Sequence, residues 1–382
     1  MQKLSRYVFE TQNKLYNSMN KIYLEKNSSE LLLKENFFLS GQEKDSLEKR
    51  LFKKPEMLQL RIIPTWECNL RCNHCSVLSN LKINDPCLIE KKDVLNFCKS
   101  HLERYNHSKI RISFIGGECL IQASLCLEIV KLISNLNVDF ECNLTTNLAC
   151  DLTIEAIELL EKTSQFTVSL DGDEEQHNWQ RKSINKNINP YKKTVANIKR
   201  CILLGFSDKM TVQAAVQEKQ FDETKKEQYY KFLLKLGVKN IVYGSCHPTI
   251  QNPDLDKGYV DYLKSGSISN APCCEYRFMR FFTINSKNEL SSEYYTAENK
   301  FGNLKDFDFD FIENIYKNKI KNNMSILKDE TCMNECPVVA YCWGKCVNHE
   351  LYNKDFAEQP SKYCDREKLI KKIRNLAFQE KL

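Results

Sequence analysis

The sequence lacks any apolar run that approaches the roughly 20 residues of a membrane span. Residues 1–10 carry polar side chains where a secretory signal peptide would be apolar. The chain also has no evident internal repeat and no low-complexity tract. We therefore predict a cytoplasmic protein that has no membrane partner.

A long run of one charge sign is missing as well. The 56 basic and 50 acidic residues give a net charge of +6, and both signs are spread along the chain. Such a balance is typical of a solvated mixed surface, and it gives no reason to expect binding to nucleic acid. We predict no nucleic-acid partner.

Cysteine, in contrast, is abundant, with 18 residues in 382. A chain without an export signal stays in the reducing cytosol, where thiols remain free rather than forming a disulfide framework. Metal ligation is the leading explanation for this many cysteines.

Apolar, β-branched runs alternate with longer amphipathic segments through the middle of the chain. Six runs predict strands, at residues 58–64, 110–115, 140–144, 166–170, 210–216 and 241–243. Five segments predict helices, at residues 90–104, 124–136, 153–162, 190–204 and 223–236. Strands that alternate with helices form a parallel sheet, and right-handed crossovers would curl it into an open, partial (β/α)6 barrel of the α/β class.

Two further regions flank this barrel, as expected of a chain longer than the roughly 250 to 300 residues at which single cores give way to domains. Residues 1–55 are rich in lysine and glutamate and predict a small helical or hairpin attachment. The barrel would occupy residues 56–250. Residues 251–382 are dense in cysteine, predict a metal-stapled domain and end in an amphipathic helix over 366–382.

A first cysteine motif, Cys68-Asn-Leu-Arg-Cys72-Asn-His74-Cys75, comes directly after the first predicted strand. Three thiolates can hold three irons of a cubane, which leaves the fourth iron open for a chelating cofactor. Two alternatives stay open, namely three ordinary reduced thiols and a zinc site.

The spacing C-x3-C-x2-C, with the wording Cys-Asn-Leu-Arg-Cys, resembles the signature of the radical S-adenosylmethionine (SAM) superfamily. The resemblance implies a catalytic 4Fe-4S cluster on Cys68, Cys72 and Cys75, and SAM as the cofactor that the cluster cleaves. It also implies an electron donor such as flavodoxin or ferredoxin. His74 stands where the family usually has an aromatic residue near the adenine, and its imidazole can stack or donate a hydrogen bond; a surface histidine is the alternative.

Gly116-Gly117-Glu118 follows the second predicted strand and resembles the GGE motif of the same family. The two glycines would expose backbone to the cofactor, and the resemblance implies that Glu118 binds its methionyl amine. Cys119 stands where proline usually follows. A plain tight turn is the alternative.

Four more residues near predicted strand ends resemble family positions that face the cofactor. Ser169 or Asp171 would bind the ribose hydroxyls, while Asn147 and Arg181 would make polar and carboxylate contacts. Loop capping and a surface arginine are the alternatives. No residue stands out as a general base.

A second motif, Cys332-x3-Cys336-x5-Cys342-x3-Cys346 followed by Cys364, resembles the SPASM extension of radical enzymes that modify peptides and proteins. The family has one residue fewer between the first two cysteines. The resemblance implies one auxiliary 4Fe-4S cluster on Cys332, Cys336, Cys342 and Cys364.

A second auxiliary cluster would use Cys346 and either Cys273 or Cys274. Asn288 stands at the place of a family glycine, and Glu293 at that of a further cysteine, so this cluster has an open or carboxylate-bound iron or is absent. Cys246 is a remote spare ligand. A zinc module is the alternative for the whole region, since four thiolates also satisfy zinc.

Together the two motifs imply a radical SAM enzyme that modifies a ribosomally synthesised precursor peptide, installing a thioether, a carbon-carbon crosslink or a related change. One alternative is a protein maturase of the anaerobic sulfatase-activating, formylglycine-forming type. The other is a noncatalytic metal-binding regulatory module, which would produce no 5'-deoxyadenosine.

Overall fold

The computed structural model covers the chain in two compact units, Pro55–Asp256 with Arg280–Asp308 and Met1–Lys54 with Lys257–Met279 and Phe309–Leu382. We call the first the barrel unit and the second the outer unit. The residues that the structure describes are 4, 7–10, 14–17, 22–27, 52, 54–75, 77, 81–82, 84–216, 223–245, 278–292, 300–323, 331, 335–337, 367 and 370–371.

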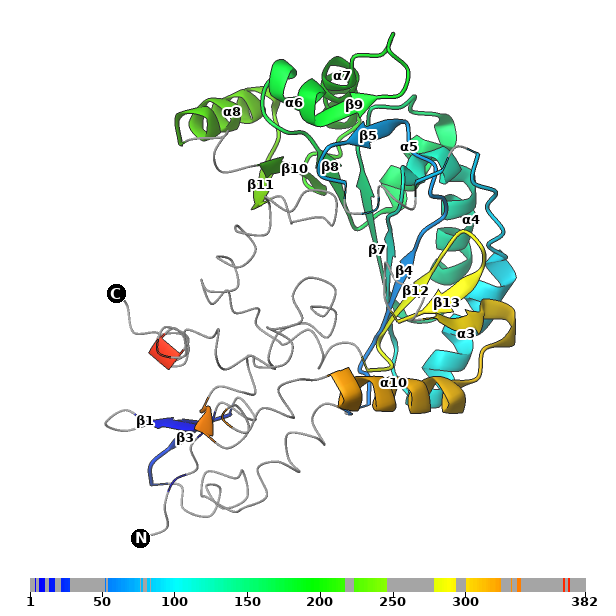
Figure 1. The fold of residues 1–382 in the computed structure, drawn as a ribbon, viewed down its shortest axis with the longest axis vertical. Helices are drawn as coiled ribbons and strands as arrows, with labels where there is room; N and C mark the ends of the chain where they lie inside the picture. The colour runs from blue at the N-terminus through cyan, green and yellow to red at the C-terminus, as the bar shows by residue number, and fades with distance from the viewer. Residues whose placement is uncertain are drawn as a thin grey trace. The chain divides into compact units, whose positions relative to one another are not determined.

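A nine-stranded sheet forms the centre of the barrel unit (Figure 1). Its order is β11-β10-β8-β7-β6-β4-β12-β13-β14, and all neighbours from β11 to β12 are parallel. The six strands predicted from the sequence are β4 (Leu58–Ile62), β6 (Lys109–Phe114), β7 (Asp139–Thr146), β8 (Gln165–Ser169), β10 (Met210–Val216) and β11 (Asn240–Ser245). They lie in the sheet in chain order, which confirms the predicted α/β class and partial barrel.

The five predicted helices connect these strands, and their bounds are α3 (Lys91–Tyr105), α4 (Ala123–Ser134), α5 (Ile154–Lys162), α7 (Pro190–Leu203) and α8 (Glu223–Leu236). Each forms where its apolar residues recur at helical spacing. In α3, for example, Val94, Phe97, Cys98, His101 and Tyr105 are all buried. Helices α3, α4 and α5 lie on the same side of the sheet (Figure 1).

Two short elements were not predicted. Helix α6 (Glu174–Gln180) is followed at once by β9 (Arg181–Ser183), which pairs antiparallel with β5 (Leu70–Cys72). Because β5 lies within the cysteine loop, this ribbon ties the loop to a segment more than 100 residues further along the chain.

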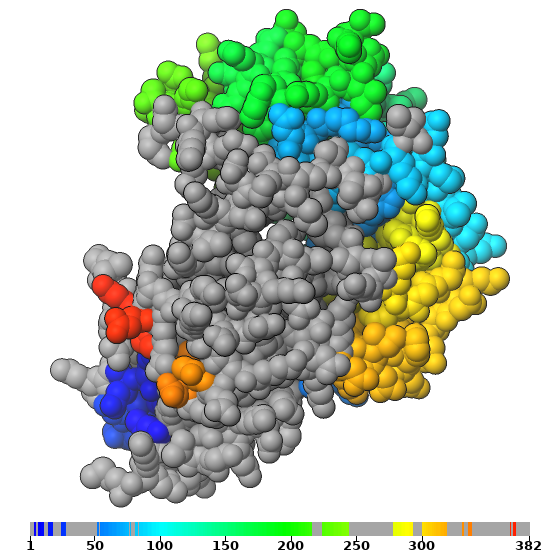
Figure 2. All heavy atoms as spheres, in the orientation of Figure 1, coloured from blue at the N-terminus to red at the C-terminus, as the bar shows by residue number. Residues whose placement is uncertain are grey.

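The sheet also continues past β4 with strands from a segment that we had assigned to the cysteine-rich domain. Strand β12 (Phe281–Ile284) pairs parallel with β4, and β13 (Glu289–Ser291) and β14 (Lys300–Asn303) extend the edge antiparallel. Figure 2 shows residues 281–292 in yellow beside the cyan residues of the barrel. The predicted boundary at residue 250 lies outside the described residues.

The described part of the outer unit contains a small antiparallel sheet of β1 (Val8–Glu10), β2 (Lys14–Asn17) and β3 (Ile22–Glu25). Leu15 forms its buried centre, packed by Leu4, Val8 and Leu24. Helix α10 (Phe309–Asn323) also belongs to this unit. Most of the predicted helix over 366–382 lies outside the described residues. No described helix is both long and apolar enough to cross a membrane.

Candidate active site

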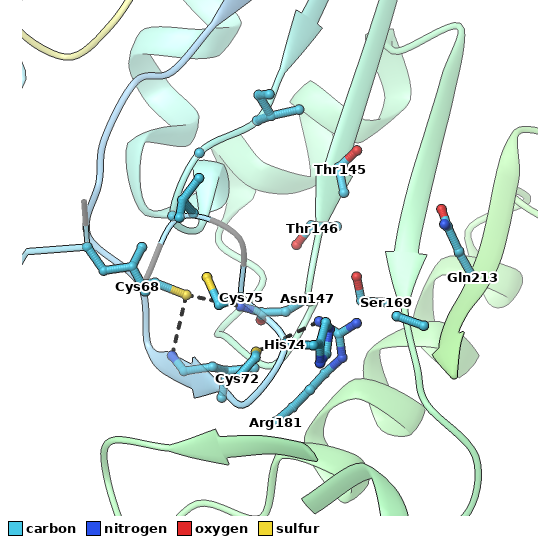
Figure 3. Close-up of a pocket in the computed structure, with 17 residues that line it drawn as sticks. Cys68, Cys72, His74, Cys75, Thr145, Thr146, Asn147, Ser169, Arg181 and Gln213 are labelled. Carbon is cyan, nitrogen blue, oxygen red and sulfur yellow. Dashed lines mark hydrogen bonds between the residues drawn. The ribbon is translucent and has the colours of Figure 1, made fainter. Parts of the chain in front are cut away.

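A pocket of about 440 Å³ lies at the carboxyl ends of the parallel strands (Figure 3). The cysteine loop lines it after β4, and the segment that follows β6 together with residues of β7, β8, β9 and β10 completes its wall. Its volume falls in the range of about 300 to 1,000 Å³ that holds small molecules and cofactors. The carboxyl edge is where parallel α/β sheets place their ligands, because the loops that follow the strands converge there.

All three cysteines of the first motif line this pocket. Burial raises the pKa of the Cys68 thiol to about 12 and that of Cys72 to about 11, and it raises the pKa of Cys75 as well. Buried thiolates need a positive partner, since desolvation favours the neutral form. A bound metal supplies such a partner, and a coordinating thiol is deprotonated by it.

Three thiols on one loop match the number of protein ligands of a cubane that keeps one iron open. Among the residues that the structure describes, no three cysteine, histidine or acidic side chains converge on one metal position. Zinc needs its ligands to meet around one ion at about 2.3 Å. The three thiolates of a cubane each bind a different iron and therefore do not converge on one position.

Gly116 and Gly117 let the cysteine loop pass directly over the end of β6. The Gly117 amide donates to the Thr65 carbonyl at 3.0 Å, and the Glu118 amide donates to the Glu67 carbonyl at 2.8 Å. A Cβ added at Gly117 would lie 2.0 Å from the Glu67 carbonyl oxygen. Both glycines line the pocket, and the contacts that an added Cβ would make show that the pair is required for the close backbone approach.

Glu118 does not line the pocket. It is fully buried, and its Oε1 accepts from the Leu120 amide at 3.1 Å and the Thr146 hydroxyl at 2.7 Å. Its Oε2 accepts from the Asn147 amide at 2.7 Å. Burial raises the pKa of this carboxyl, while the donors on both oxygens oppose the rise. The carboxylate predicted to face the cofactor thus points into the wall of the site.

Asn147 lies at the end of β7 and lines the pocket. Its Nδ2 donates to Asn69 Oδ1 at 2.8 Å and lies 3.8 Å from Cys68 Sγ, within reach of a hydrogen bond to sulfur. Its Oδ1 accepts from the Ala149 amide at 2.8 Å. The Thr194 hydroxyl donates to its carbonyl at 2.9 Å. All four polar groups of Asn147, its main-chain amide and carbonyl and its Oδ1 and Nδ2, therefore have partners in the surrounding chain.

Arg181 lies beside Cys72 because the two residues are register partners in the β5–β9 ribbon. Its Nη1 is 3.9 Å from Cys72 Sγ, and its Nε and Nη2 donate to Asp171 at 2.5 and 3.1 Å. Burial alone would raise the pKa of Asp171, but the guanidinium outweighs it and the pKa is lowered. Arg181 lines the pocket, while Asp171 is fully buried behind it.

Ser169 and His74 also line the pocket. His74 Nδ1 accepts from Gln180 Nε2 at 3.0 Å, so in the neutral ring Nε2 carries the hydrogen. Burial lowers the pKa of His74 to about 4, with Arg181 adding to the effect. The ring is thus neutral near pH 7, as stacking or hydrogen bonding to an uncharged base requires.

The pocket brings together six of the eight residues predicted to face the cofactor, and only Glu118 and Asp171 lie outside its lining. Gln213 lines it without having been predicted, and Thr145 lines it as part of the Thr145-Thr146-Asn147 run, which resembles family positions that face the cofactor. Gln213 lies in the middle of the predicted strand over residues 210–216, and nothing in its local sequence separates it from other polar strand residues.

The second cysteine motif lies almost wholly outside the described residues. Cys336 is described and is buried. Cys273, Cys274, Cys332, Cys342, Cys346 and Cys364, the spare Cys246 and also Glu293 lie outside. Asn288, at the place of a family glycine, has a φ of +60°, in the left-handed region that glycine and asparagine favour.

Comparison with known proteins agrees with this geometry. Residues 62–227 match the sequence profile of the Radical SAM superfamily. Among curated proteins, no sequence matches the chain.

Solved structures of anSMEcpe share the fold. The structure with bound AdoMet and the Kp18Cys peptide has 17% identity and a TM-score of 0.59, covering 85% of this chain and 99% of that one. A second, with bound AdoMet and the Cp18Cys peptide, has 17% identity and a TM-score of 0.57, covering 85% and 100%. Residues 62–227, which hold the cysteine loop and most of the pocket wall, belong to the radical SAM superfamily, and the chain is a radical SAM enzyme.

Proposed function

We propose that the chain is a radical SAM peptide maturase, which abstracts a hydrogen atom from a ribosomally synthesised precursor peptide and installs a thioether, a carbon-carbon crosslink or a related modification. The observation that carries this proposal is the pocket itself. Three thiols, that of Cys68 buried and those of Cys72 and Cys75 half-buried, meet residues of the parallel strands β7, β8 and β10 at one edge of the sheet. The substrate class rests on likeness, since the anSMEcpe structures hold AdoMet together with a peptide.

In this proposal Cys68, Cys72 and Cys75 hold the catalytic 4Fe-4S cluster, and SAM occupies the pocket beside it. When bound, the two supply one-electron cleavage of the cofactor and hydrogen-atom abstraction from the substrate. The chain's own residues bind and orient the cofactor and exclude water. Those in the pocket lining with this role are His74, Gly116, Gly117, Asn147, Ser169 and Arg181.

The second cysteine motif would hold auxiliary clusters in the cysteine-rich domain. Cys332, Cys336, Cys342 and Cys364 would bind one, and Cys346 with Cys273 or Cys274 a second. An auxiliary cluster can bind a substrate thiolate or accept the electron that remains after crosslinking. An electron donor such as flavodoxin or ferredoxin would reduce the catalytic cluster.

The test is anaerobic reconstitution followed by incubation with SAM, a reductant and the peptides encoded beside the gene. We expect 5'-deoxyadenosine to form and the peptide to become lighter by two hydrogens. Deuterium uptake from heavy water would reveal epimerisation, which leaves the mass in ordinary water unchanged. Replacing Cys68, Cys72 and Cys75 together by alanine should abolish both products, while Cys201→Ala, at a buried cysteine that does not line the pocket, is the matched control. Deoxyadenosine without any change to a peptide would contradict the maturase proposal.

A second candidate is a protein maturase of the sulfatase-activating, formylglycine-forming type. The likeness to anSMEcpe over 85% of this chain favours it. It predicts that a cysteine or serine in a folded or nascent protein is oxidised to an aldehyde. Reaction of the product with a hydrazide probe would separate this outcome from a crosslink, which leaves no aldehyde.

A further inference from the structure

Two carboxylates lie directly behind the pocket wall, and neither reaches the cofactor space. Glu118 and Asp171 are both fully buried and absent from the pocket lining. Each oxygen of both groups accepts at least one hydrogen bond from the protein. An acceptor already occupied in this way has little capacity left for a ligand amine or hydroxyl.

Glu118 positions Asn147, the residue whose side chain contacts Cys68 Sγ. It holds the main-chain amide of Asn147 at 2.7 Å and also the hydroxyl of Thr146, the preceding residue. The Asn147 side chain then directs its Nδ2 between Asn69 Oδ1 and Cys68 Sγ. One residue therefore separates the buried carboxylate from the sulfur.

Asp171 repeats this arrangement on the second cysteine. Both of its carboxylate oxygens accept hydrogen bonds from Arg181, and its Oδ1 also accepts one from the Ala215 amide at 2.8 Å. Arg181 Nη1 then lies 3.9 Å from Cys72 Sγ (Figure 3). Glu118 thus positions the Asn147 amide beside Cys68 Sγ, and Asp171 positions the Arg181 guanidinium beside Cys72 Sγ.

We propose that Glu118 and Asp171 are positioning residues that hold the Asn147 amide and the Arg181 guanidinium against Cys68 and Cys72, so that these two donors raise the reduction potential of the cluster. The inference rests on the proposed function, since it takes these cysteines as cluster ligands. It gives Glu118 a role different from the one its motif implies, which is contact with the cofactor's amine.

The direction of the effect follows from charge. Reduction adds one electron to the cluster, and part of that charge resides on the sulfurs. A hydrogen-bond donor or a cation beside a sulfur stabilises the more negative state, so reduction becomes easier. Burial strengthens the effect because water does not screen it. Loss of either donor should therefore make the midpoint potential more negative.

The experiment is a redox titration of the reconstituted protein, followed by EPR in the absence of SAM. We expect Asn147→Ala to shift the midpoint potential negatively. Glu118→Gln removes a negative charge, which raises the potential, and releases the Asn147 donor, which lowers it. We therefore expect Glu118→Gln to raise the potential less in the wild-type protein than in the Asn147→Ala protein, where only the effect of the charge remains. A variant whose reduction becomes tenfold less favourable shifts by about 59 mV for one electron. At the second sulfur the test is Arg181→Lys, which keeps the positive charge but loses the guanidinium donor held against Cys72, and we expect it to shift the potential negatively.

Thr194→Val is the matched control. It removes a buried hydrogen bond to the same residue, Asn147, but to its main-chain carbonyl rather than to the amide groups that Glu118 and Cys68 contact. We expect it to lower thermal stability and to leave the midpoint potential unchanged. If Glu118→Gln fails to fold, Asn147→Ala tests the same link, and Arg181→Lys tests the second sulfur independently.

An unchanged potential in the cluster-loaded Asn147→Ala protein would overturn the inference. So would an equal rise on Glu118→Gln in the wild-type and Asn147→Ala proteins, and weaker SAM binding by that variant would then place the carboxylate on the cofactor. A wild-type protein without any iron-sulfur EPR signal would instead refute the proposed function, so the two failures are distinguishable.

Discussion

Gly117→Ala tests the close approach between the backbone at residue 117 and the backbone of the cysteine loop at residues 66 and 67. The added Cβ would lie 2.0 Å from the Glu67 carbonyl oxygen, 2.6 Å from its carbonyl carbon and 2.9 Å from the Trp66 carbonyl carbon. Ordinary contact begins at 3.4 Å, so the loop must move by about 1.4 Å. These are all backbone atoms, and no side chain can rotate away to relieve the contact. Because Cys68 follows Glu67 directly, the movement carries over to the first cluster cysteine.

The cost follows from the interactions that this movement disturbs. Overpacking of a buried site costs about 1 to 3 kcal/mol. The two backbone hydrogen bonds that tie residues 65 and 67 to residues 117 and 118 contribute about 0.5 to 1.5 kcal/mol each. We expect the free energy of unfolding to fall by about 2 to 6 kcal/mol in total. We also expect iron content to fall, because a ligand displaced by about 1 Å no longer meets its iron.

Denaturant unfolding and iron analysis after anaerobic reconstitution measure both effects. Gly205→Ala is the control, since its φ of +83° penalises alanine while nothing lies within 4 Å of the new Cβ. It should cost about 1 to 2 kcal/mol from backbone strain and leave iron content unchanged. A Gly117→Ala protein that keeps wild-type stability and full iron would show that the loop does not rest on residue 117.

Two further predictions concern the scaffold around the site. Burial lowers the pKa of His177 to about 4 from 6.5, with Asp171 opposing the shift and Arg181 and His74 adding to it. The stability that neutral His177 contributes is therefore full above pH 6.5 and is lost as the pH falls towards 4, by up to about 3 kcal/mol. His177→Asn, which keeps an acceptor for the Asp171 amide, should flatten this loss in denaturant unfolding between pH 7 and 4, and an equal slope in both proteins would contradict it. Thr153→Ala removes the side-chain cap on the Ala156 amide of α5 and should cost about 1 kcal/mol in thermal unfolding, whereas Thr153→Ser should restore most of it.

The strands and helices of the barrel were predictable because each is set by a local pattern. The six strands carry apolar β-branched runs, and five helices carry an apolar stripe, so neither needed knowledge of a distant partner. Helix α6 and strand β9 have only 7 and 3 residues, too few for a periodic pattern to emerge. Strand β12 was missed because the cysteines that surround it in the sequence indicated a separate module.

The candidate site was predictable in its location and less so in its details. Parallel strands end at one edge, so polar residues that follow several strands were expected to meet there. The direction of each side chain depends on partners far away in the sequence. Glu118 turns into the wall because Asn147, 29 residues later, offers it an amide. Arg181 reaches Cys72 only through the register of β5 with β9, which no local pattern encodes.

The placement of the two carboxylates also has an electrostatic consequence for the whole site. A cluster that must accept an electron is hindered by any nearby negative charge, and the repulsion is large where water is excluded. Here the charge of Asp171 is balanced by Arg181, and that of Glu118 is spread over three donors. The atoms that contact the sulfurs are N–H donors, Asn147 Nδ2 at Cys68 and Arg181 Nη1 at Cys72. The wall can therefore contain two carboxylates that fix the geometry of the loop. At Cys72 the positive charge of Arg181 outweighs the negative charge of Asp171, whereas at Cys68 the charge of Glu118 opposes added negative charge and only the Asn147 donor works in its favour.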